Sequence, residues 1–149
     1  MKIATIDNKS IAAELGLQAG DEVYRINGQR VRDILDYRFL ITDENVEVEV
    51  RREGESTLYE IEKDSDDSLG LNFEPIKIRK CGNDCIFCFV DQNPAGMRST
   101  MYFRDEDFRL SFLSGHYVTL SNISRTDLAR VVRQRLTPLF ISVHATEPS

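Results

Sequence analysis

Three cysteines within eight residues constrain this chain more than any other feature of its sequence. Cys81, Cys85 and Cys88 are the only cysteines, and their spacing is C-x3-C-x2-C. Three thiols cannot all pair as disulfides within the chain. The chain has few cysteines and shows no signal-peptide pattern at its start, so the sequence does not suggest an oxidising compartment. The short spacings let three thiolates surround one small volume, which indicates a metal or cluster site.

Two kinds of metal site remain open from the residues alone. A structural zinc site usually has four protein ligands, so zinc would have to recruit His116 or His144 from distant positions. An iron–sulfur cluster held by three cysteines keeps one iron without a protein ligand, where a small molecule can coordinate. The spacing favours the cluster.

The cysteine segment also resembles a known family. Cys81, Cys85 and Cys88, with the aromatic Phe87 before the last, resemble the C-x3-C-x-aromatic-C signature of radical S-adenosylmethionine (radical SAM) enzymes. The runs 85–98 and 102–113 are similar to poorly characterised bacterial radical SAM-like iron–sulfur proteins with an N-terminal PDZ-like domain, and the resemblance spans all 149 residues. It implies that the three cysteines hold a [4Fe-4S] cluster, that S-adenosylmethionine binds the open iron, and that Phe87 lies against its adenine.

Further site residues are expected in the second half of the chain. Ser121 and Asn122 stand where many radical SAM enzymes carry a Gly-Gly-Glu-type segment, and we expect their polar groups to bind the cofactor. The chain departs from the family pattern at this segment. Arg98 is expected to pair with a carboxylate of the cofactor; a solvated surface arginine is the alternative. His144 follows an expected strand and is a candidate catalytic acid or base, since histidine titrates near neutrality.

The first half of the chain resembles a bacterial PDZ domain. The pattern Ser10-x-Ala-x-x-x-Gly16-x-x-x-Gly-Asp21, followed by Ile-Asn-Gly28, carries this resemblance. The residues predict strands over 3–6, 46–50 and 58–61, a helix capped by Ser10, a helix over 33–41, and an exposed acidic loop over 63–68. The resemblance implies that Leu69, Gly70 and Leu71 form the loop that receives a peptide's terminal carboxylate; a plain closing strand is the alternative.

The predicted fold class is mixed α/β, in two domains. Residues 1–74 are expected to form a PDZ-like, partly open β-barrel with short helices, and residues 75–149 the first βα units of a parallel radical SAM partial barrel. Strands are predicted over 76–79, 117–120 and 139–143, with a helix from Ser124 to Leu136. Such barrels in the resembling family have about six strands, so we expect an amino-terminal part of a longer protein, inactive by itself.

Charge and hydropathy limit the partners. Residues 1–75 carry 9 basic and 18 acidic side chains, net −9, whereas residues 76–149 carry 10 and 7, net +3. An acidic chain without a basic stripe argues against nucleic acid, and no apolar run reaches the roughly 20 residues that span a bilayer. We expect a cytoplasmic protein whose partners are S-adenosylmethionine, an unidentified substrate, an electron donor and a peptide or protein docked on the PDZ-like domain. The alternatives are a non-catalytic peptide-binding module with a zinc knuckle and an electron-transfer iron–sulfur protein.

Overall fold

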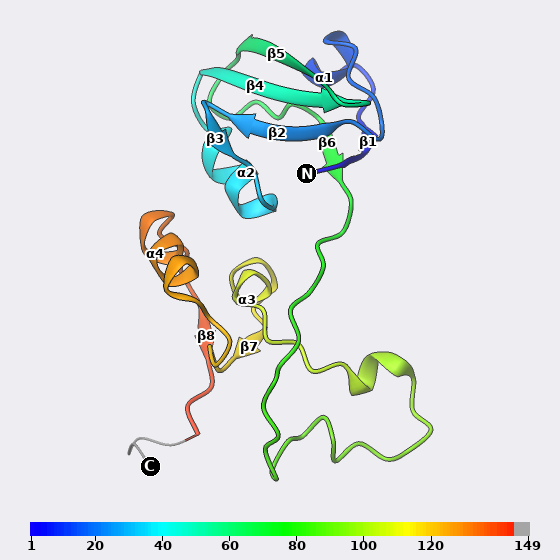
Figure 1. Ribbon diagram of the computed structural model, residues 1–149, viewed down its shortest axis with the longest axis vertical. Coiled ribbons are helices and arrows are strands. Elements are labelled where there is room, and N and C mark those ends of the chain that lie inside the picture. The colour runs from blue at the N-terminus through cyan, green and yellow to red at the C-terminus, as the bar shows by residue number, and fades with distance from the viewer. Residues whose placement is uncertain (145–149) are drawn as a thin grey trace. The chain divides into compact units, whose positions relative to one another are not determined.

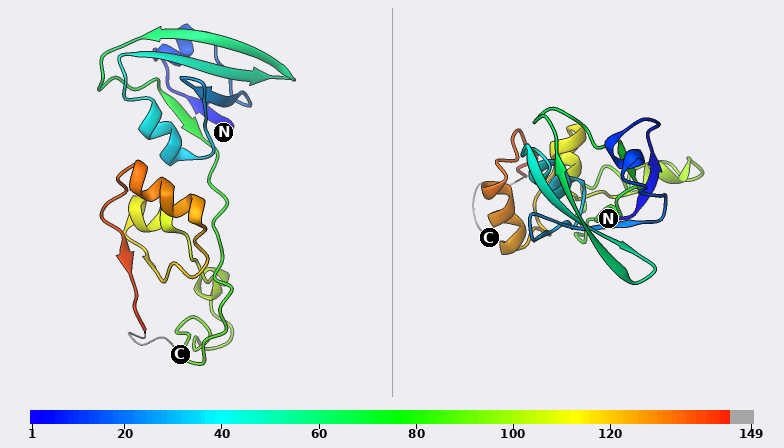
Figure 2. Two further views of the ribbon diagram at one scale, coloured as in Figure 1. Left: turned by 60° about the vertical axis from the view of Figure 1, so that its left-hand side comes forward. Right: turned by 90° about the horizontal axis from the view of Figure 1, so that it is seen from above.

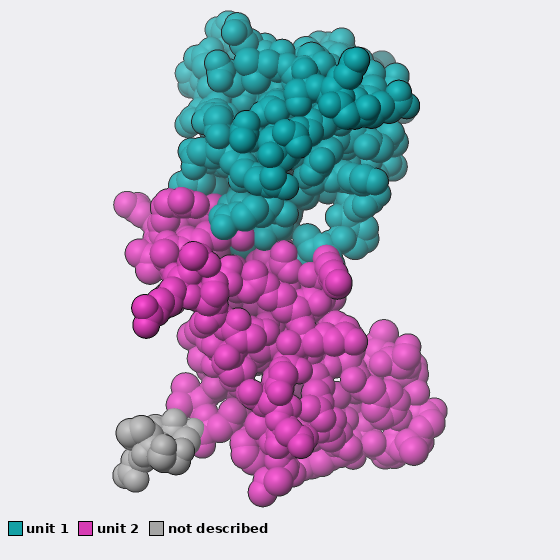
Figure 3. All heavy atoms as spheres, viewed as in Figure 1, with its two compact units in different colours: residues 1–76 teal, residues 77–149 magenta. Residues whose placement is uncertain are grey.

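The computed structural model of the protein describes residues 1–144. The chain divides into two compact units, residues 1–76 and residues 77–149 (Figure 3). Strands and short helices occur in both units, which confirms the predicted mixed α/β class. No helix among the described residues is long and apolar enough to cross a membrane.

The first unit is built on antiparallel strands (Figures 1 and 2). One sheet has the strand order β3-β2-β4-β5, and a separate pair joins β1 to β6. The elements are β1 (Ile3–Ile6), α1 (Ile11–Glu14), β2 (Glu22–Ile26), β3 (Gln29–Arg30), α2 (Ile34–Leu40), β4 (Asn45–Arg52), β5 (Glu55–Glu62) and β6 (Leu71–Phe73).

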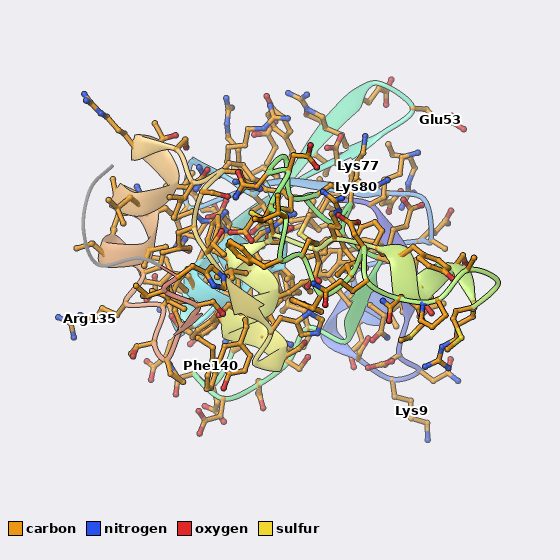
Figure 4. All side chains as sticks on the ribbon, turned by 90° about the horizontal axis from the view of Figure 1, so that it is seen from below. Lys9, Glu53, Lys77, Lys80, Arg135 and Phe140 are labelled. Carbon is orange, nitrogen blue, oxygen red and sulfur yellow. The ribbon has the colours of Figure 1, made fainter. Side chains whose placement is uncertain are left out.

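Buried valines alternate with more exposed residues along β4, and the valines identify the buried face of the larger sheet. Val46, Val48 and Val50 are all at most 3% exposed, and they pack with residues of β1, β2 and α2 in one core. The turn from β4 into β5 places Glu53 and Gly54 at positive φ, as a tight hairpin requires, and the Glu53 side chain points away from the protein (Figure 4). The strands predicted over 46–50 and 58–61 are therefore confirmed, and they pair as a hairpin.

The first helix of this unit begins at its predicted cap, Ser10, and the structure shows Asp33 capping the second. The Ser10 hydroxyl accepts a hydrogen bond from the Ala13 N–H, and the Asp33 carboxylate accepts from the N–H groups of Leu35 and Asp36. The loop over 63–68 is exposed as predicted except at its first residue. Lys63 is buried, and its ammonium group donates to the backbone carbonyls of Asp64 and Ser65, which satisfy its charge locally.

The second unit contains short elements joined by long irregular segments. They are the 3₁₀ helix η1 (Ser99–Tyr102), α3 (Phe108–Ser114), β7 (Tyr117–Val118), α4 (Arg125–Arg133) and β8 (Phe140–Ile141). Strands β7 and β8 pair in parallel, with α4 between them in the chain. The predicted helix and the two strands around it are present, although each is shorter than expected.

The strand predicted over 76–79 is wrong. Residues 74–79 form no strand, and Lys80 makes only an isolated bridge to Asp105. Two side chains at the start of α3 bind this backbone instead. The Arg79 N–H donates to the carboxylate of Asp107, the N-cap residue, and Arg109 Nη2 donates to the Lys77 carbonyl. These groups replace the partner strand on which the prediction depended.

Candidate functional sites

The cysteine loop is a series of tight turns. The Cys88 N–H donates to the Cys85 carbonyl at 3.0 Å, and the N–H groups of Asp91 and Gln92 both donate to the Cys88 carbonyl. All three cysteines are free and half-buried. Cys85 and Cys88 thus begin and end one turn, and Cys81 precedes it in the chain.

Arg104 binds this loop at several points. Its backbone carbonyl accepts from the Cys81 N–H at 2.9 Å, and its Nη1 donates to the Asn83 carbonyl at 2.8 Å. The same guanidinium group forms a two-pronged ion pair with the Asp91 carboxylate, just beyond Cys88. This hydrogen-bonded pair holds the pKa of Asp91 below its usual value. One residue therefore connects the beginning of the cysteine loop to its end.

A second set of polar contacts reaches the loop from the residues after β7. The Asn83 side chain donates to the Ser121 hydroxyl at 3.0 Å. The Asn122 amide group donates to the carbonyls of Lys80 and Glu106, at 3.3 and 2.9 Å. The structure therefore places Ser121 and Asn122 beside the cysteine loop, where they contact its backbone and one of its side chains.

The first unit contains a groove between α2 and β6. The cavity there has a volume of about 560 Å3. Tyr37 of α2 and Phe73 of β6 meet edge to face, with ring centroids 4.7 Å apart, and burial raises the pKa of Tyr37 to about 12. The lining residues include Ile34, Tyr37, Arg38, Ile41, Leu69, Leu71 and Phe73.

Gly70 fixes the chain where it enters β6. Its φ is +74°, and a Cβ built on it would lie 2.3 Å from the Ser10 Cβ. The Gly70 carbonyl accepts from the Asp7 N–H, and the Leu69 carbonyl accepts from the Ala12 N–H. Only glycine allows this close approach, which joins the 69–71 loop to the start of α1.

Comparison with known families also assigns the two halves of the chain to different domain types. A radical SAM-like domain profile matches residues 63–149, which is more than half of the chain and includes the whole cysteine loop. The chain belongs to the radical SAM-like family. A PDZ domain profile matches residues 2–52. No curated protein matches the chain.

The radical SAM-like match begins inside the first compact unit. The radical SAM-like match begins at residue 63, but β6 lies after that point and pairs with β1 of the PDZ match. Residues 63–76 therefore belong physically to the PDZ-containing unit.

The structure brings two other expected site residues together in the radical SAM-like unit. The rings of Phe87 and His144 lie 5.2 Å apart between centroids, and both side chains are exposed. Arg98 is also exposed and forms no ion pair with a described residue. His116, the other histidine, lies against a different group, with its Nδ1 2.7 Å from the Asp105 carboxylate.

Three free thiols on one turn-rich loop are a donor set that suits an iron–sulfur cluster. In residues 1–144 no group of three or more His, Cys, Asp or Glu side chains is arranged to hold a metal ion. The donor chemistry and the anchoring of the loop fit the family's cluster, and the side chains would have to turn toward one point to bind it. Sequence reasoning missed Arg104, because nothing local distinguishes it from other exposed arginines.

Proposed function

We propose that this protein is a radical SAM-type iron–sulfur protein in which Cys81, Cys85 and Cys88 hold a [4Fe-4S] cluster. The observation that carries the proposal is the anchored loop of three free cysteines inside the radical SAM-like match. Arg104 fixes the loop at Cys81, at Asn83 and beyond Cys88, so the loop is partly ordered before it binds any ligand. When bound, the cluster would supply the electron for reductive cleavage of S-adenosylmethionine.

The residues around the loop are proposed to bind the cofactor. Phe87 presents an exposed ring that would stack on adenine, and the neighbouring His144 is the candidate acid or base. Ser121 and Asn122 already contact the loop and are proposed to orient the polar end of the cofactor. Arg98, exposed beside η1, is proposed to bind its carboxylate.

The architecture proposed for the complete function is a PDZ-like domain over 1–74, followed from residue 75 by the first βα units of a parallel partial barrel. The parallel β7–β8 pair with α4 between its strands supports the second part. The free thiols agree with a reducing compartment, and we propose the cytoplasm.

The groove between α2 and β6 supports a second role, peptide docking. It lies beside Leu69, Gly70 and Leu71, and Leu69 and Leu71 line it. Strand β6 pairs only with β1 among the described strands, so its other edge is open for an added strand. We propose that a partner peptide docks there while the cysteine loop carries the chemistry.

Metal analysis of the full chain tests the cluster proposal. Anaerobic purification and reconstitution should give iron and acid-labile sulfide in equal amounts, near four of each per chain. Replacement of any one of the three cysteines by serine should remove most of both. Zinc without iron would favour the zinc-knuckle alternative, and a cluster whose redox couple ignores S-adenosylmethionine would favour simple electron transfer.

A further inference from the structure

The open edge of β6 presents alternate backbone groups to the groove. The Gly70 carbonyl accepts from the Asp7 N–H and the Glu74 N–H donates to the Lys2 carbonyl, at the two residues that flank β1. Backbone groups alternate in direction along a strand, so those of Leu71 and Phe73 face the opposite edge, beside α2. An extended segment can pair with these groups and place every second side chain in the cavity.

The floor of the groove is apolar. Ile34 and Tyr37 of α2 line it together with Ile41, which follows the helix, and Leu71 and Phe73 line it from β6. A volume of about 560 Å3 accommodates two or three side chains of a bound segment. The side chains that point inward should therefore be apolar.

The end of the groove beside Gly70 is poorly suited to a terminal carboxylate. The Gly70 N–H, one of the amides in the expected carboxylate loop, already donates to the Ser68 hydroxyl at 3.1 Å. Asp66 and Asp67 line the cavity just before this loop, and Glu74 lines it beyond β6. These three carboxylates line the groove with a single arginine, Arg38, in a unit of strongly negative net charge.

We propose that the groove binds an internal, extended segment with alternating apolar and basic residues, and that it does not require a terminal carboxylate. The inference rests on the proposed docking role and states the chemistry of the partner. Main-chain pairing with β6 supplies the register, apolar residues fill the cavity, and Lys or Arg residues of the segment meet Asp66, Asp67 and Glu74.

Four labelled peptides test this inference on the full chain. Acetyl-Lys-Val-Lys-Val-Lys-Val is prepared with a C-terminal amide and with a free carboxylate, and both forms are also made with Glu in place of Lys. Fluorescence polarisation should show that the Lys amide binds at least as tightly as the Lys acid, and at least tenfold more tightly than the Glu amide.

Variants that neutralise carboxylates test whether the preference for basic peptides comes from the groove. The double variant Asp66→Asn/Asp67→Asn should weaken the Lys amide about threefold to tenfold and strengthen the acid relative to it. The matched control Glu47→Gln/Glu60→Gln removes two carboxylates that face each other across β4 and β5, outside the groove, and should leave both affinities within twofold. Acid forms that bind tenfold tighter than amides would overturn the inference alone. No binding by any of the four peptides would overturn the docking role as well.

Discussion

The backbone carbonyl of Arg104 accepts a hydrogen bond from the N–H of Cys81 at 2.9 Å, while the Arg104 side chain binds beyond Cys88. A single residue thus restrains both ends of the loop that carries the three thiols. A restrained loop loses less conformational entropy when its side chains gather around a ligand. Loop order should therefore depend on Arg104 before any iron is present.

Arg104→Gln should loosen the cysteine loop, because it removes the bonds to Asn83 and Asp91 and keeps only the backbone contact. Thiol alkylation of the iron-free protein should become several-fold faster, and iron incorporation should fall. Arg104→Lys should recover only part of the effect, since lysine cannot form the two-pronged pair. Arg133→Gln, an exposed arginine of α4, is the control. Equal alkylation rates in all four proteins would contradict the restraint.

Phe87→Ala should weaken S-adenosylmethionine binding and leave the iron content unchanged. Stacking of an aromatic ring on a base contributes roughly 1–3 kcal/mol, so the dissociation constant should rise by about 5- to 150-fold. Phe89→Ala is the matched control, since this ring is 81% exposed two residues later. Isothermal titration calorimetry of the two reconstituted variants with S-adenosylmethionine measures both dissociation constants. An unchanged constant for Phe87→Ala would remove the ring from the cofactor site.

Asp127→Asn should destabilise the second unit in a pH-dependent way. The Asp127 carboxylate accepts two bonds from the Arg79 guanidinium, at 2.8 and 3.1 Å, and it also belongs to the capping box of α4. The Arg79 hydrogen bonds hold the pKa of Asp127 far below its usual value, so this stabilisation is present above about pH 4 and is lost as the pH falls further.

At pH 7 the substitution should cost about 1–3 kcal/mol. Thermal unfolding followed by circular dichroism at pH 7 and at successively lower pH values measures the difference from wild type, which should shrink below about pH 4. The same difference at every pH would show that the ion pair is not its source.

Gly70→Ala should destabilise the first unit by more than about 2 kcal/mol, because it adds a steric clash with Ser10 to the strain of a positive φ. Gly16→Ala is a matched control, since Gly16 has φ +71° and open space around it. Adding Ser10→Gly should recover the part of the loss due to the clash. Urea unfolding of the full chain measures all three. Equal losses at Gly16 and Gly70 would rule out the clash.

Much of the first unit could be predicted from the sequence because its signals are local. The alternation of Val46, Val48 and Val50 and the Ser10 cap each depend on neighbouring residues only. The strand predicted over 76–79 failed because a strand needs a partner, and side chains of Asp107 and Arg109 bind that backbone instead.

The candidate site was only partly predictable, because most of its contacts join residues that are distant in the sequence. The cysteine spacing identified the loop, but the contacts of Arg104 with Asn83 and Asp91 join residues that are 21 and 13 positions apart, respectively. The sequence proposed Asn122 as a cofactor residue, and the structure adds its bonds to the carbonyls of Lys80 and Glu106. Such contacts depend on how the segments approach in three dimensions, and no local pattern encodes them.

We propose that Cys81, Cys85 and Cys88, which are free thiols, hold a cluster with one iron open to S-adenosylmethionine. Electron paramagnetic resonance of the reduced, reconstituted full chain, recorded before and after addition of S-adenosylmethionine, tests it most directly. We expect a [4Fe-4S]⁺ signal that is absent when any of the three cysteines is replaced by serine, and whose g values shift on addition of the cofactor. A cluster signal that S-adenosylmethionine leaves unchanged, or one that survives the loss of a cysteine, would contradict it.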